Sequence, residues 1–104
     1  MNEGDPVVIG TIDRSGLHAV VKAHRARLHQ CYQQELTRLP SLSGKIVVRF
    51  VIAADGSVSS VSVTRSSMGN GVVESCLTET LRALQFPEPE GGGIVVVSYP
   101  LIFR

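Results

Sequence analysis

The sequence predicts an α+β fold of order βαββαβ, in which two helices pack on one face of an antiparallel sheet. Three observations support this prediction: a hairpin pattern over residues 45–66, two segments with helical spacing of apolar residues, and an apolar strand over residues 94–103. The chain has 104 residues, of which 43% are hydrophobic, so a single core can form. We therefore expect one domain over residues 7–104, preceded by a disordered lead-in over residues 1–6.

The first strand and the first helix are expected within residues 7–38. Residues 7–11 form a short apolar run typical of a strand, and Asp13 is a suitable N-cap because its carboxylate accepts from free amides of the first helical turn. A helix over residues 14–38 gathers apolar side chains on one side. They are Leu17, Val20, Val21, His24, Leu28, Cys31, Tyr32, Leu36 and Leu39. Pro40 ends the helix, since the residue before a proline disfavours the α conformation.

The hairpin shows the two-residue period of a half-buried strand. Apolar Ile46, Val48, Phe50 and Ile52 alternate with Lys45, Val47, Arg49 and Val51, and Val61 and Val63 continue the apolar face. Asp55 and Gly56 supply the turn, because Asp tolerates turn conformations and Gly accepts a positive φ. We expect the apolar face to be buried beneath the helices. The residues expected to stay accessible are Lys45, Arg49, Ser60, Ser62 and Thr64.

A second helix over residues 72–84 and a last strand over residues 94–103 complete the order, joined by a proline- and glycine-rich connection over residues 86–93. Pro100 lacks the backbone donor of a ladder, so we expect this strand at the edge of the sheet. Backbone groups of alternate residues point to the same side of a strand. Counting back from Pro100, the edge that would bind a partner strand consists of Ile94, Val96, Ser98 and Pro100.

The two cysteines fall on the inward faces of the two predicted helices. Cys31 and Cys76 are the only cysteines, and we expect a disulfide between them that ties the helices together. Such a bond would place the domain in an oxidising compartment. The alternative is that both are reduced and act as small buried hydrophobic residues.

The sequence carries no pattern typical of an enzyme, a cofactor site or a metal site. His18, His24 and His29 form no pair at ligand spacing on a helix, and the serines around residues 57–67 lack a triad pattern. The glycines at 91–93 neither follow a strand nor open a helix, which argues against a phosphate site. A net charge of +1 and a sheet face without aromatic residues argue against nucleic acid as a partner. Without an apolar run of 18 residues or an apolar start, we expect neither a membrane span nor a secretory signal in this chain.

Nearly the whole chain resembles the TonB C-terminal domain superfamily. The segments that carry the resemblance are residues 44–52, the turn at 55–58, the second helix, Phe86-Pro87 and residues 93–97. More narrowly, the chain is similar to the AgmX/PglI type of this domain, found in myxobacterial gliding-motility and related envelope proteins. That similarity rests on Cys31-Tyr32, Glu35-Leu36, residues 40–44, Cys76, residues 86–93 and Tyr99-Pro100.

The resemblance implies a periplasmic domain of a longer, inner-membrane-anchored protein. Such a domain couples an energised motor complex to an outer-membrane or envelope partner, and it grips an extended peptide segment of that partner as an added strand. Any contact with the membrane would then pass through an anchor of the parent protein. Two alternatives remain open at this stage: a homodimerisation or structural domain that uses the same edge strand, and a regulatory domain that binds a metal or a nucleotide.

Overall fold

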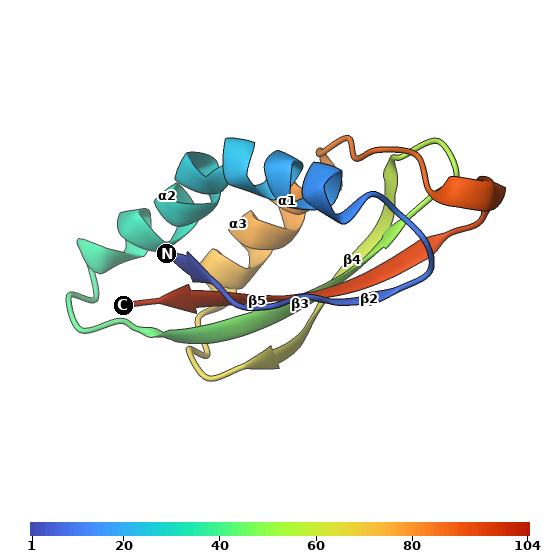
Figure 1. Ribbon diagram of the computed structural model, residues 1–104. Coiled ribbons are helices and arrows are strands. Elements are labelled where there is room, and N and C mark those ends of the chain that lie inside the picture. Colours follow the sequence, from blue (N-terminus) through green and yellow to red (C-terminus); the bar gives the residue numbers. More distant parts are fainter.

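The computed structural model describes residues 1–104 and has three helices on one face of an antiparallel five-stranded sheet (Figure 1). The elements are β1 (Asn2–Glu3), β2 (Val7–Ile9), α1 (Arg14–Ala23), α2 (Arg25–Leu36), β3 (Gly44–Ile52), β4 (Val58–Ser66), α3 (Gly71–Arg82), a short 3₁₀ turn η1 (Glu90–Gly92) and β5 (Val95–Phe103). The sheet order is β1-β5-β3-β4, and β2 also pairs with β5. This arrangement confirms the predicted fold class.

The predicted hairpin is present as β3 and β4. Its turn depends on Gly56, which has φ 84°, and a Cβ there would lie 2.2 Å from the backbone oxygen of Phe86. Asp55 stabilises the turn, because its Oδ1 accepts from the backbone N–H of Ser57 at 3.0 Å and from the Ser57 hydroxyl at 2.6 Å. Only glycine fits a position that combines a positive φ with so close a backbone contact.

The two faces of the hairpin are as predicted. Ile46, Val48, Phe50 and Ile52 are fully buried beneath the helices. Lys45, Arg49, Ser60, Ser62 and Thr64 are exposed. Val61 and Val63 are only half-buried, which corrects the expectation for these two. They lie on β4, the outermost strand of the sheet, where no neighbouring strand covers them from one side.

The single helix expected over residues 14–38 is divided into α1 and α2 at His24. This residue has φ −106° and ψ 11°, outside the helical values. Its ring Nδ1 donates to the carbonyl oxygen of Val20 at 2.8 Å. A side chain that enters the backbone hydrogen-bond ladder kinks a helix, and this accounts for the division.

A disulfide and a polar network join α2 to α3. Cys31 and Cys76 are bonded, with their Cα atoms 5.5 Å apart, as the sequence predicts. Glu35 Oε1 accepts from Arg38 at 2.8 Å and from the side-chain amide of Asn70, the N-cap residue of α3, at 3.1 Å. These hydrogen bonds, that from Arg38 first, lower the pKa of Glu35. Both connections hold the two helices side by side above the sheet.

The last strand lies inside the sheet, which corrects the prediction of a free edge. β5 pairs with β3 on one side and with β1 and β2 on the other. Pro100 is tolerated because residues 4–6, which separate β1 from β2, lie opposite it and make no regular ladder there. The N–H of Gly4 donates to the Pro100 carbonyl at 3.0 Å. The backbone N–H that Pro100 lacks is therefore not needed, because the ladder on this side is interrupted at residues 4–6.

The predicted disordered lead-in is likewise replaced by structure, because Asn2 and Glu3 pair with Ile102 and Leu101. The polar composition of residues 1–6 indicated disorder. The free backbone edge of β5 nevertheless supplies hydrogen-bond partners that satisfy this segment without any need to bury its side chains. In Figure 1 the N-terminal segment runs along β5, close to the C-terminus of the chain.

Candidate functional site

The three histidines have three different partners. His18 Nδ1 lies 3.0 Å from the hydroxyl of Tyr99, His24 bonds to its own helix, and the ring of His29 lies beside that of Tyr32. No group of three or more His, Cys, Asp or Glu side chains is placed where it could hold a metal ion. The binding surface that the sequence predicts is an edge of the sheet.

The outer edge belongs to β5, a long strand. On its inner side, β5 pairs with β3 from Gly44↔Phe103 to Ile52↔Val95 without a register shift. The carbonyl of Pro100 points away from β3, because it accepts from Gly4. With alternate residues sharing a direction, we infer that the backbone groups of Val96 and Ser98 also point outward.

The predicted site residues are brought together only in part. Val96, Ser98 and Pro100 lie in sequence along this edge, half-buried, with their side chains on the face of the sheet opposite the helices, the open face. Ile94 precedes the strand and is 62% exposed, because the 3₁₀ turn and its glycines delay the start of β5. The edge is also occupied, which the sequence reasoning missed.

The occupant is the chain's own segment of residues 2–9, the N-terminal strap. It runs antiparallel to β5, with Val7, Val8 and Ile9 opposite Ser98, Val97 and Val96. The pairing of residues 2–9 with β5 joins segments far apart in the chain, so it produces no pattern among neighbouring residues of the sequence. The only signal for it was the short apolar run at residues 7–9.

The opposite edge of the sheet, on β4, is less regular. Two register shifts leave Ser59 and Thr64 without a partner on β3, so the ladder is continuous only over residues 60–63. The hydroxyls of both residues donate to carbonyls of β3, at 3.4 Å and 3.3 Å. Bulges of this kind discourage pairing with another strand.

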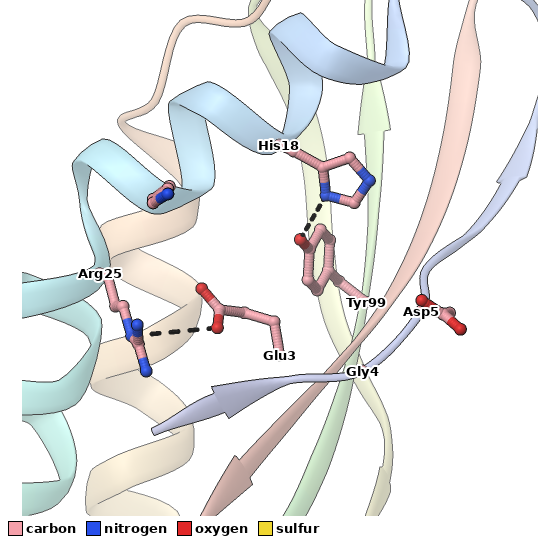
Figure 2. Close-up of a pocket in the computed structure, with 7 residues that line it drawn as sticks. Glu3, Gly4, Asp5, His18, Arg25 and Tyr99 are labelled. Atoms are coloured by element: carbon pink, nitrogen blue, oxygen red, sulfur yellow. Dashed lines mark hydrogen bonds and ion pairs between the residues drawn. The ribbon is translucent and has the colours of Figure 1, made fainter.

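A polar cavity of about 240 Å³ lies between the strap, α1 and β5 (Figure 2). His18 and Lys22 of α1, Arg25 at the start of α2 and Tyr99 of β5 form one side of it, and Glu3, Gly4 and Asp5 of the strap form the other. Arg25 Nε is 3.9 Å from Glu3 Oε2. Burial, reinforced by the charges of Glu3 and Asp5, raises the pKa of Tyr99, which stays a neutral phenol. The spacing of residues 18, 22 and 25 on one face of the helix predicted over residues 14–38 was the available sequence signal.

A family model described as the Gram-negative bacterial TonB protein C-terminal matches residues 35–104. The chain belongs to this family. Neither the curated proteins nor the solved structures that were searched include a match. The narrower similarity to the AgmX/PglI type stays a prediction.

The TonB C-terminal match covers helix α3 and three strands of the sheet, β3, β4 and β5. It begins at Glu35, so the strap, α1 and most of α2 lie outside it. TonB C-terminal domains engage protein partners, which makes this chain a protein–protein interaction domain of the Gram-negative envelope. None of its helices is both long and apolar enough to cross a membrane.

Proposed function

We propose that this TonB C-terminal domain is a non-enzymatic periplasmic adaptor that binds an extended segment of an outer-membrane or envelope protein as an added strand on β5. One observation carries the proposal: β5 is a nine-residue strand whose outer edge accepts an extended segment, namely the strap, in two ladders on either side of an interruption at residues 4–6. Strand addition supplies affinity through main-chain hydrogen bonds and specificity through alternate side chains.

The disulfide supports a periplasmic location, since such bonds persist in oxidising compartments. In the parent protein, the domain would couple an energised motor complex in the inner membrane to its partner. The gliding-motility machinery is the setting that the AgmX/PglI resemblance suggests. A strand pairing suits a coupling role because pulling along the strands loads many backbone hydrogen bonds together.

The test is photocrosslinking in the native envelope, from a photoreactive residue in place of Ser98. Ser62 is the matched control, because both serines flank Arg49 in one row of the sheet, one on β5 and the other on β4. We expect Ser98 to crosslink to one contiguous extended segment of a partner and Ser62 to give no such product. Crosslinks to a partner segment from Ser62 and none from Ser98 would place the docking site on β4 and contradict the proposal.

A homodimer through the same edge is the second candidate. It is favoured by the strap itself. Gly10, which follows the strap and has φ 111°, forms a bend at which the strap could turn away from its own β5 and pair with β5 of a second copy. Light scattering separates the candidates. An adaptor that awaits a foreign segment has the mass of one chain, whereas strap exchange gives the mass of two.

A further inference from the structure

We propose that the strap is an intramolecular substitute for the partner segment, and that the basic cavity it covers is a carboxylate-binding site that selects the partner. The inference rests on the proposed function at β5. It adds three points that neither the fold nor the family match supplies. The strap competes with the partner segment, the partner segment carries an acidic residue at a defined position, and it runs antiparallel to β5.

The side of the cavity formed by the body of the domain is basic. It carries His18, Lys22, Arg25 and the phenol of Tyr99 and no acidic group. Both acids that line the cavity, Glu3 and Asp5, belong to the strap. Glu3 faces this side because it pairs with the buried Leu101, whose side chain points toward the helices. Removing the strap would therefore leave a basic site ready to accept a carboxylate (Figure 2).

The strap is held in a way that permits exchange. None of residues 2–9 is fully buried, and Val7 and Ile9 are 62% and 65% exposed. Most of its hold on β5 comes from backbone pairing, which any extended segment can replace. The chain is held on both sides of the strap. Before it, Met1 packs against the core and its carbonyl accepts from Arg25. After the Gly10 bend, the Thr11 carbonyl accepts from the Glu90 N–H at 2.8 Å and Ile12 enters the core.

The strap also indicates the chemistry of the partner segment. An acidic residue sits opposite Leu101, and the position of the next residue, Gly4, favours a small residue because a Cβ there would lie 3.1 Å from the Pro100 ring. Five residues after the acid, Val8 is half-buried opposite Val97 and contacts the core. We therefore expect a segment antiparallel to β5 with an acidic residue, a small residue and then an aliphatic residue at this spacing.

The first test needs no variant. Amide hydrogen exchange of the full chain should show the outward N–H groups of Val96 and Ser98 exchanging at least about tenfold faster than the inward ones of Val97 and Tyr99, because the strap opens without global unfolding. Equal exchange of all four through global unfolding would overturn the proposal, since the strap would then be a permanent strand of the fold.

The second test uses a peptide with the sequence of residues 2–10, blocked at both ends and titrated by NMR. The full chain should bind it poorly, because the attached strap competes at an effective concentration on the order of millimolar. Val7→Pro removes a strap donor without touching the core and should raise the affinity at least about tenfold, whereas the matched control Val7→Ala keeps the donor and should behave as wild type. Equal affinities for all three chains, or no shift at Val96 and Ser98 in folded Val7→Pro, would overturn the competitor role.

The carboxylate site is tested by a double-mutant cycle on the Val7→Pro chain. A peptide with Gln in place of Glu3 should bind about two- to fivefold more weakly, the range for exposed ion pairs, and this loss should vanish in Arg25→Gln. An equal loss with and without Arg25 would overturn the selection by charge. The outcome is separate from the envelope crosslinking: a partner captured at Ser98 by a chain whose strap never opens would contradict the strap proposal alone.

Discussion

Replacing both Cys31 and Cys76 by alanine should lower the free energy of unfolding by about 4 kcal/mol. The two residues are separated by 45 positions, and closing a loop of that length removes about 13 cal/mol/K of entropy from the unfolded chain, or about 4 kcal/mol at 25 °C. Domains of this size have total stabilities of about 5–15 kcal/mol, so the variant should fold but melt roughly 15–30 °C lower.

The assay is urea denaturation of the oxidised wild type, the reduced wild type and the double variant, followed by circular dichroism. Reduction removes the cross-link and keeps both side chains, so it isolates the effect on the unfolded chain from the loss of a buried sulfur at Cys31. The reduced protein and the double variant should agree within about 1 kcal/mol. A difference of less than about 1 kcal/mol between oxidised and reduced wild type would refute the loop-closure reasoning.

Three further predictions concern the fold. Gly56→Ala should cost at least about 2 kcal/mol in urea denaturation, through a positive φ and a backbone clash, whereas Gly69→Ala, with φ 65° and no atom within 4 Å, should cost only about 1–2 kcal/mol. Phe50→Ala should cost about 3–5 kcal/mol and its exposed neighbour Arg49→Ala no more than about 0.5 kcal/mol; the reverse order would disprove the register. The pKa of Glu35 is lowered on folding, so its contribution is present above its ordinary value of 4.5 and is lost as the pH falls below it. Between pH 6 and pH 3, the melting temperature of the wild type should therefore fall by more than that of Glu35→Gln.

Local chemistry was enough to predict the hairpin and the covalent link between the helices. The alternation through Phe50 assigns each residue of β3 to a face, because the side-chain period of a strand is two. The Asp55-Gly56 pair marks the turn, since few residues adopt its conformation. Cys31 and Cys76 were paired correctly because each lay on the apolar side of its helix, and two packed helices bring such sides together.

The helix division and the cavity depended on contacts that the sequence pattern does not encode. The apolar periodicity runs through His24 unchanged, so it could not reveal that the histidine ring bonds to its own helix. The cavity forms because α1 and the start of α2 place His18, Lys22 and Arg25 beside the strap, which pairs with β5. Helical spacing put these three residues on one face of the predicted helix but left open what they would meet.

By itself, the sequence determined the order of the elements, the buried and exposed faces of the hairpin, the disulfide and the family to which residues 35–104 belong. Only the tertiary structure decided that β5 is an inner strand and that its outer edge is occupied. Strands pair through backbone groups, and every residue except proline carries both a donor and an acceptor. The amino-acid composition therefore does not reveal which segment pairs with a given strand edge. The strap and β5 stand at opposite ends of the chain, and folding brings them together because an unpaired edge would otherwise leave its donors and acceptors to water.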